Sequence, residues 1–309
     1  MSVLTSFRNV IIYGMGMMGT SLAYALKNHP SFKGRIIGVV RNEKSKTWIL
    51  ENQLADEVWL SEEAEIFSRL KEVDFLIIGL PVLDTLDLLE KLEEIRFSGL
   101  ITDMGSTRIQ IENKARQLES SFPLRFVGAH PICGSEHSGP EGYVKNLFEN
   151  KLCIIINRLS QNHQEDRNPK DQEAVSSFWQ ELRMKVFLMD AETHDYVLSY
   201  LSHAPHILSS VLSTIIGRNK IITRWNQESP IPILGGGLRD MLRIAGSNPK
   251  MWFDIISTNK QNILQTLKDY QKELEYLISI FENDEWKDWW WEWQTKAKIY
   301  RDTLYGNSQ

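Results

Sequence analysis

The chain has 309 residues, 42% of them hydrophobic and 24% charged, and its formal net charge is −5. This composition is ordinary for a globular protein, and the negative charge argues against a general surface for nucleic acid or anionic membranes. The length exceeds what one core usually serves, so two domains are expected. Two cysteines, no signal-peptide core and no apolar run of membrane-spanning length favour a cytoplasmic protein without disulfides.

The first expected element is an apolar strand at residues 10–13 that leads into Gly14, Gly16 and Gly19, followed at once by a helical pattern. This G-x-G-x-x-G spacing between strand and helix is typical of dinucleotide binding. We expect Gly14 to permit a tight turn, Gly16 to admit a pyrophosphate and Gly19 to let the helix pack closely. Met17 and Met18 begin that helix, whose free N–H groups attract phosphates. The alternative is an ordinary strand–helix turn.

Up to residue 190, short apolar runs alternate with helical patterns. Further strands are expected at residues 35–40, 58–60, 73–81, 100–103, 125–129, 151–157 and 185–190. Helices are expected at residues 44–54, 61–70 with Ser61 as the N-cap, 83–95, 108–118 and 172–182. The polar stretch 158–171 is interpreted as a surface loop. The alternation predicts an α/β fold, with a Rossmann-type doubly wound parallel sheet in a dinucleotide-binding domain of residues 1–190.

Beyond residue 191 almost the whole sequence has helical character. The expected helices cover residues 191–216, 238–246, 249–282 and 286–304. So many helices need buried helix–helix faces, within one chain or between chains. We therefore expect an all-helical domain at residues 191–309 that binds substrate and dimerises.

The end of the second strand bears on the choice of dinucleotide. An acid at this position favours NAD, whereas a nearby arginine accommodates the 2′-phosphate of NADP. Here no acid occupies the strand end, and Arg41, Asn42 and Ser45, with Lys44, follow it. This pattern favours NADP. NAD stays open, because Glu43 is close enough to turn inward.

Two polar stretches, 103–107 and 128–139, follow expected strands and therefore belong to the sheet edge where α/β proteins bind ligands. His130 is a candidate proton acceptor for a substrate hydroxyl during hydride transfer. Ser106 is a candidate hydrogen-bond partner of the same hydroxyl or of the histidine. The alternative for His130 is a histidine that only bonds the backbone. No spacing of His, Cys, Asp and Glu suggests a metal site.

These residues belong to a longer series of motifs that resembles the prephenate/arogenate dehydrogenase family of tyrosine biosynthesis. The series comprises the glycine motif, Asp103-x-Gly105-Ser106, His130-Pro131-x-x-Gly134-x-Glu136-x-x-Gly139, His194-Asp195, Ser202-His203-x-Pro205-His206, Gly236-Gly237-Leu238-Arg239-Asp240-x-x-Arg243-Ile244-Ala245, Asn248-Pro249-x-x-Trp252 and Asn259. The resemblance implies oxidative decarboxylation of prephenate to 4-hydroxyphenylpyruvate, with hydride transfer to NAD(P)+. It also implies a homodimer formed through the helical domain.

The resemblance further implies roles for single residues. His130 accepts the hydrogen bond of the substrate hydroxyl, and Ser106 assists. Arg243 binds a carboxylate, and His206 lies near the substrate side chain. Glu136 matches an acidic position of prephenate-using members, which favours prephenate over arogenate.

The substrate is a dianion, so the site of this acidic protein must be locally positive. Arg239 and Arg243 are spaced i, i+4, and His203 and His206 are spaced i, i+3, so each pair shares one helix face. Pro205 predicts a kink between the histidines. The alternative is that the arginines pair with Asp240 and the histidines are core residues. His194-Asp195 is interpreted as an anchor of a helix start.

Five of the ten tryptophans lie between residues 286 and 293. Trp286, Trp289, Trp290 and Trp293 form one helical stripe with Ala297, and Trp291 lies on the other side. Neighbouring acids argue against nucleic-acid stacking, and no strongly basic face supports a membrane-surface helix. We expect a buried stripe at a domain or dimer interface.

Three other functions are compatible with parts of the pattern. Arogenate dehydrogenase differs only in substrate. A β-hydroxyacid dehydrogenase typically uses a lysine base, and no lysine here replaces His130. A noncatalytic dinucleotide-binding sensor has no reason to retain Ser106, His130 and Arg243 together.

Overall fold

The computed structural model describes residues 2–63, 65–134, 137–157, 169–283 and 286–306. The chain forms two compact units, Met1–Lys260 and Gln261–Gln309. None of the helices in the described ranges is both long and apolar enough to cross a membrane.

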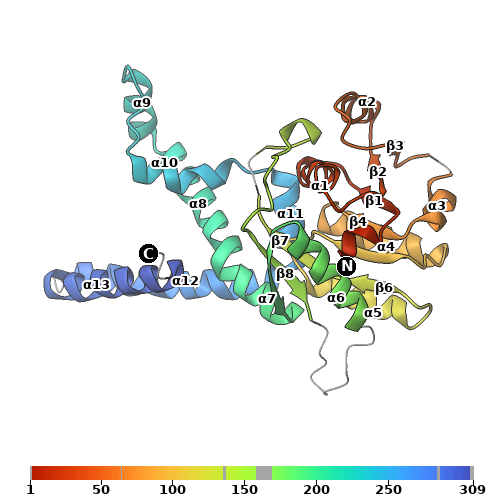
Figure 1. Ribbon diagram of the computed structural model, residues 1–309. Coiled ribbons are helices and arrows are strands. Elements are labelled where there is room, and N and C mark those ends of the chain that lie inside the picture. Colours follow the sequence, from red (N-terminus) through yellow and green to blue (C-terminus); the bar gives the residue numbers. More distant parts are fainter. Residues whose placement is uncertain (1, 64, 135–136, 158–168, 284–285, 307–309) are drawn as a thin grey trace. The chain divides into compact units, whose positions relative to one another are not determined.

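The first unit is built on a six-stranded parallel sheet with the strand order β3-β2-β1-β4-β5-β6 (Figure 1). Its strands are β1 Asn9–Tyr13, β2 Arg35–Val40, β3 Glu57–Leu60, β4 Phe75–Ile78, β5 Leu100–Asp103 and β6 Arg125–Val127. This is the order of a doubly wound dinucleotide-binding sheet, so the predicted fold class is confirmed. The order reverses between β1 and β4, and ligands bind beyond the carboxyl ends of strands at such a point.

Helices cover both faces of this sheet. They are α1 Met17–Lys27, α2 Glu43–Glu51, α3 Ile66–Arg69, α4 Val82–Glu94, α5 Ile109–Glu119 and α6 Pro169–Glu181, with 3₁₀ turns at Val3–Thr5, Leu70–Glu72 and Pro140–Gly142. Alternate side chains of β1 enter different cores. Val10 and Ile12 pack in one cluster and Ile11 and Tyr13 in another. Burial on both faces explains why the parallel strands are continuous apolar runs rather than alternating ones.

A second, three-stranded sheet has the order β7-β8-β9, with strands β7 Ala129–Ile132, β8 Leu152–Ile156 and β9 Lys185–Met189. β7 is antiparallel to β8, and β9 is parallel to β8. The single strand predicted at residues 125–129 is therefore wrong, because β6 and β7 belong to different sheets. The chain divides them at Gly128, where a Cβ would lie 2.1 Å from Glu112 Oε1 and 2.3 Å from Arg108 Nη2.

Two other expectations about helices are wrong. Ser61 does not cap a helix, because its backbone N–H donates to Val40 O at 2.8 Å and continues the sheet pairing of β3, while α3 begins only at Ile66. The single helix expected at residues 249–282 is two helices, α11 Pro249–Thr258 and α12 Lys260–Glu282, separated at Asn259. The polar loop expected at residues 158–171 lies mostly outside the described residues, and α6 already begins at Pro169.

The rest of the first unit is helical. Its elements are α7 Ala191–Leu198, a π-helical turn at Ser199–His203, α8 Ala204–Arg218, α9 Lys220–Glu228, α10 Gly236–Arg243 and a 3₁₀ turn at Ile244–Gly246. The π-helical turn ends two residues before Pro205, which has no N–H to continue regular α-helical bonding. Helix α7 packs on α5 and α11 packs on α4, whereas α9 and α10 both pack on α8.

The second unit contains α12 beyond Lys260 and α13 Trp286–Tyr305. Aromatic contacts join its two helices, since Tyr276 meets Trp289 and Phe281 meets Trp286. In the single chain the predicted tryptophan stripe is only partly covered, since Trp290 and Trp293 are each 36% exposed. Trp291, outside the stripe, is 75% exposed.

Candidate active site

The glycine turn between β1 and α1 has the geometry that a dinucleotide requires. Gly14 has φ of 103°, and a Cβ there would lie 2.6 Å from Gly79 O. A Cβ on Gly19 would lie 2.4 Å from Gly14 O, whereas a Cβ on Gly16 would have no atom within 4 Å in the described structure. The fold itself therefore requires Gly14 and Gly19. The open space at Gly16, at the start of α1, fits the approach of a pyrophosphate.

Three turns meet at the carboxyl edge of the parallel sheet. Gly79, which follows β4, lies so close to the first turn that a Cβ on it would be 2.7 Å from Gly14 O and 2.9 Å from Met104 Cε. Met104 follows β5, and its N–H donates to Ile78 O at 3.0 Å. The stretch predicted to carry chemistry, 103–107, is thus adjacent to the glycine turn.

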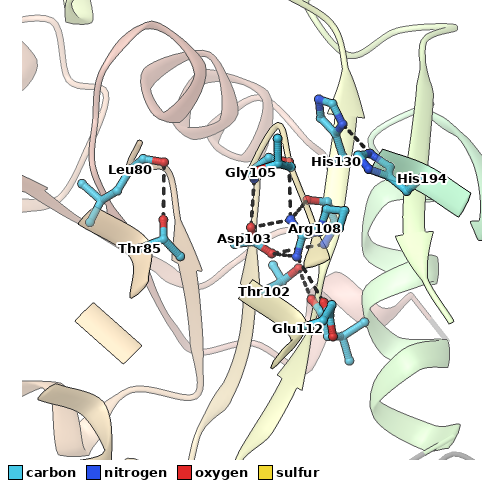
Figure 2. A network of polar contacts seen from close by, with 12 residues as sticks. Leu80, Thr85, Thr102, Asp103, Gly105, Arg108, Glu112, His130 and His194 are labelled. Atoms are coloured by element: carbon cyan, nitrogen blue, oxygen red, sulfur yellow. Dashed lines mark hydrogen bonds and ion pairs between the residues drawn. The ribbon is translucent and has the colours of Figure 1, made fainter. Parts of the chain in front are cut away.

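Asp103 and Arg108 form a buried ion pair at this edge (Figure 2). Arg108 Nη1 donates to Asp103 Oδ2 at 2.6 Å, and Nη2 donates to Asp103 Oδ1 at 2.8 Å and to Glu112 Oε1 at 3.2 Å. Burial alone would lower the pKa of the guanidinium, but Asp103 and then Glu112 raise it above its usual value. Arg108 is therefore a permanent charge whose partners are fixed.

The same ion pair positions the strand that carries His130. Arg108 Nη1 donates to Ala129 O at 3.0 Å, and Ala129 N–H donates to Asp103 Oδ1 at 3.3 Å. The first residue of β7 is thereby tied to the end of β5. Sequence reasoning missed Arg108, although a strand-end acid followed by an arginine just before a helix was a usable signal.

His130 is partly buried and lies in a chain of polar side chains. Its Nδ1 is 2.8 Å from His194 Nε2, and His194 Nδ1 is 2.8 Å from Asp195 Oδ1 (Figure 2 shows the two histidines facing each other). Burial, followed by the electrostatic effects of His194 and Arg108, holds the pKa of His130 well below 6.5. His130 is therefore neutral near pH 7 and able to accept a proton.

Asp195 anchors a helix start, but that helix is not its own. Its Oδ1 and Oδ2 accept the backbone N–H groups of Arg108 and Ile109, at 2.7 and 2.9 Å. These are orphan donors at the N-terminus of α5, so a residue of α7 caps α5. The turn that carries Ser106 is thereby fixed at both ends.

Ser106 is partly buried in the turn between β5 and α5. A hydrogen bond between Ser106 and His130 is not present among the described residues, because His130 Nδ1 faces His194 instead. Both predicted partners of Ser106, the substrate hydroxyl and the imidazole through its Nε2, therefore stay predictions.

His203 and His206 flank Trp252 of α11. His206 stacks on the indole with ring centroids 3.5 Å apart and planes 8° apart, and His203 meets it edge-on. His203 is 1% exposed, and Asn259 Nδ2 lies 3.1 Å from its Nδ1. Burial lowers the pKa of His203 to about 4. The structure thus brings His203 and His206 together at Trp252, a residue to which the sequence analysis gave no role in the site.

Arg239 and Arg243 are exposed on α10. Helix α10 is tied to α8 by a hydrogen bond from Ser209 Oγ to Met241 O at 2.5 Å, one turn beyond His206. Within the described residues neither arginine forms an ion pair, with Asp240 or with any other acid. The alternative that these arginines are held in helix-surface ion pairs is therefore not seen. Glu136 lies outside the described residues.

The residues after β2 have mixed roles. Arg41 is exposed, and Asn42 Oδ1 accepts Ser45 N–H at 2.9 Å as the N-cap of α2. Lys44 Nζ lies 3.6 Å from Glu141 Oε1. The Asn42 side chain is thus engaged in a helix cap, which leaves Arg41 as the cation at the strand end.

Two further kinds of chemistry find no support in the described residues. A group of three or more His, Cys, Asp or Glu side chains able to hold a metal ion is not found among them. Both cysteines are free, and burial raises the pKa of the Cys133 thiol to about 12, so it is not a thiolate near pH 7.

Comparisons with known proteins agree over most of the chain. A model of the prephenate dehydrogenase nucleotide-binding domain matches residues 22–188, and a model of the prephenate dehydrogenase dimerization domain matches residues 190–293. Prephenate dehydrogenase of Bacillus subtilis (strain 168) is 32% identical, covering 96% of this chain and 76% of the relative.

Solved structures are similar as well. The structure of prephenate dehydrogenase from Aquifex aeolicus in complex with hydroxyphenyl propionate and NAD+ has a TM-score of 0.79 and 30% identity, covering 95% of this chain and 97% of the other. Synechocystis arogenate dehydrogenase has a TM-score of 0.73 and 25% identity, covering 95% and 99%.

Proposed function

This chain belongs to the prephenate dehydrogenase family, and from that premise we propose that it converts prephenate to 4-hydroxyphenylpyruvate in tyrosine biosynthesis. It is an NAD(P)-dependent dehydrogenase, with the glycine turn after β1 fitted to the cofactor. The observation that carries the proposed chemistry is the placement of His130, which contacts His194 at 2.8 Å and follows Ala129, the residue that Arg108 and Asp103 tie to the end of β5.

The proposed reaction depends more on the orientation of the substrate ring than on strong chemical activation by the protein. Bound NAD(P)+ accepts the hydride from the hydroxyl-bearing ring carbon. His130 accepts the hydrogen bond of that hydroxyl, and Ser106 is the second hydrogen-bond partner. The ring carboxylate leaves as carbon dioxide, its electron pair completes the aromatic ring, and the oxygen becomes that of a phenol. Aromatisation makes the step effectively irreversible, so positioning of the ring supplies most of what the protein must add.

Positive side chains are proposed to bind the two carboxylates of the substrate. Arg243 is the principal candidate, because a guanidinium binds a carboxylate through two hydrogen bonds and this one has no acid partner among the described residues. Arg239 lies one turn before it on α10. We propose that His206 and His203 lie near the substrate side chain, next to Trp252. Glu136 stays a substrate-binding candidate by resemblance alone.

We propose that NADP is preferred to NAD. The support is the exposed Arg41 at the end of β2, where an acid would bind the ribose of NAD, together with the hydroxyl of Ser45. The Glu43 carboxylate lies 3.9 Å from Lys46 Nζ on its own helix, which draws it away from that role.

We also propose two functional domains, 1–190 for the cofactor and 191–309 for substrate and dimerisation. Exposed apolar side chains lie along α8, α9 and α10, among them Ile215, Ile221, Trp225 and Met241. Such a surface is too apolar to remain in water, so we propose a homodimer formed through the helical domain. Sedimentation of the protein tests this, and a monomer at micromolar concentration would contradict it. The free cysteines agree with a cytoplasmic location.

The decisive experiment follows the absorbance of reduced cofactor with each of two substrates, prephenate and arogenate, and each of two cofactors, NADP+ and NAD+. We expect turnover with prephenate, and faster turnover with NADP+. Turnover with arogenate alone would reassign the substrate. Failure with all four combinations, while dinucleotide still binds, would support the noncatalytic sensor instead.

His130→Asn tests the role of the histidine within that assay. We expect cofactor affinity to be retained and turnover to fall by about 10²- to 10⁴-fold, the range that a positioned proton acceptor contributes. Full turnover by this variant would show that His130 is not the acceptor.

A further inference from the structure

A chain of three side chains runs from the interior of the protein to the proposed acceptor. Asp195 and His194 are consecutive residues of α7. His130 lies on β7 and faces His194 (Figure 2). The two contacts in this chain, Asp195 Oδ1 to His194 Nδ1 and His194 Nε2 to His130 Nδ1, are both 2.8 Å long. Neither Asp195 nor His194 is exposed to solvent. Water therefore does not compete for these contacts.

The donors around Asp195 fix where the protons lie. Its two oxygens already accept the N–H groups of Arg108 and Ile109. A carboxylate is acceptor-only, so His194 Nδ1 must carry a proton and donate it. Burial lowers the pKa of His194, against the opposing effect of Asp195, and keeps the ring neutral. Its Nε2 is then a bare acceptor.

A bare Nε2 on His194 requires a donor opposite it. That donor is His130 Nδ1, and a neutral imidazole with a proton on Nδ1 has a lone pair on Nε2. We infer that His194 and Asp195 are positioning residues that hold His130 as its Nδ1–H tautomer, with Nε2 ready to accept the substrate hydroxyl. This inference rests on the proposed function for what His130 accepts, but the tautomer itself does not depend on the substrate.

The pair is rigidly placed. Asp195 is held by the N-terminus of α5 through its side chain, and its backbone O accepts Asn259 Nδ2 at 2.7 Å. Because Asp195 fixes the His194 ring, that ring in turn holds His130 in one orientation as well as in one tautomer. An acceptor in the other tautomer would present an N–H to the hydroxyl and could not take its proton.

Two substitutions at His194 separate this role from simple anchoring. The amide of His194→Asn lies near the former Nδ1, so it still donates to Asp195 but does not reach His130. The amide of His194→Gln reaches the former Nε2 position, so its oxygen still accepts from His130. The variants are similar in size and polarity, and each serves as the control for the other.

We expect His194→Asn to lower kcat by about 100-fold, with KM for prephenate and Kd for the cofactor changed less than about twofold. His194→Gln should lose less than about tenfold, a rescue by the side chain that keeps the acceptor. The reverse order, with asparagine tolerated and glutamine not, would show that His194 only anchors Asp195 and would overturn the inference.

Nitrogen-15 NMR of histidine-labelled wild-type protein tests the tautomer without substrate. The His130 signals are identified by their loss in His130→Gln. We expect a protonated Nδ1 and a bare Nε2 at pH 7.5. A protonated Nε2 would overturn the inference even if prephenate is oxidised, and even if the His194 variants do not fold. Failure of the wild-type protein to oxidise prephenate or arogenate would instead overturn the proposed function and leave the NMR result standing.

Discussion

Arg108 contacts both carboxylate oxygens of Asp103, at 2.6 and 2.8 Å, where neither side chain is exposed to solvent. A buried pair of this kind is costly to break, because loss of the Asp103 charge leaves the buried Arg108 guanidinium with Glu112, 3.2 Å away, as its remaining acid partner among the described residues. Since Arg108 also holds Ala129 and Asp195, loss of its partner should loosen the whole edge that carries His130.

We therefore expect Asp103→Asn to lower the free energy of unfolding by about 3–5 kcal/mol, measured by urea denaturation. The matched control is the exposed pair of Arg183 and Glu149, whose atoms are 3.2 Å apart. Glu149→Gln should cost less than about 1 kcal/mol. Equal losses in the two variants would contradict a special role for the buried pair.

The glycine turn makes a second prediction, because its glycines have different reasons to be there. Gly19→Ala places a Cβ 2.4 Å from a backbone oxygen, so we expect lower stability. Gly16→Ala meets nothing within 4 Å in the described structure, so the folded protein should tolerate it, while a bound pyrophosphate should not.

Thermal unfolding and cofactor titration separate the two effects. Gly16→Ala should keep its Tm within about 2 °C and weaken cofactor binding at least about tenfold, whereas Gly19→Ala should lower Tm by several degrees. Unchanged cofactor affinity in Gly16→Ala would show that the pyrophosphate does not approach at this residue.

The strands of the parallel sheet and its doubly wound class followed from sequence, because each strand is a short apolar run bounded by turn residues, and burial on both faces demands that pattern. The division at Gly128 did not, since it depends on Arg108 and Glu112 coming from another element to the same place. The hydrophobic pattern of a segment can predict a strand, but the close approach of Arg108 and Glu112 to Gly128 exists only once the fold has assembled.

The site shows the same limit. His130, Ser106 and the glycines could be proposed from sequence because they follow predicted strands. The link between His130 and His194 was not, because it joins residues 64 positions apart, and neither ring nitrogen has a sequence signal. The break at Asn259 was missed for a similar reason, because its side-chain amide donates to the backbone oxygen of Asp195, a residue 64 positions away.

The lowered pKa of His130 predicts an unusual pH profile. The reaction requires the neutral ring, and burial and nearby positive groups move its protonation well below pH 6.5. As the pH falls, activity should therefore persist through the region where an ordinary histidine loses it. We expect kcat/KM to be nearly constant from pH 8 to 6, measured with recovery of activity on return to pH 8 as a control for unfolding. A loss centred near 6.5 would contradict the burial of this ring.

Arg243→Gln tests the proposed carboxylate contact. The side chain is exposed and without an ion pair among the described residues, so its removal should leave the free energy of unfolding within about 0.5 kcal/mol of wild type. Loss of a charged hydrogen bond to the substrate carboxylate should raise KM for prephenate by about 10- to 100-fold. Because this contact forms equally in the ground and transition states, kcat should change little, and so should cofactor affinity. Arg218→Gln, on the last turn of α8, is the matched control and should leave KM unchanged. If both substitutions raise KM alike, the effect comes from the overall charge of the protein, and Arg243 is not the residue that binds the carboxylate.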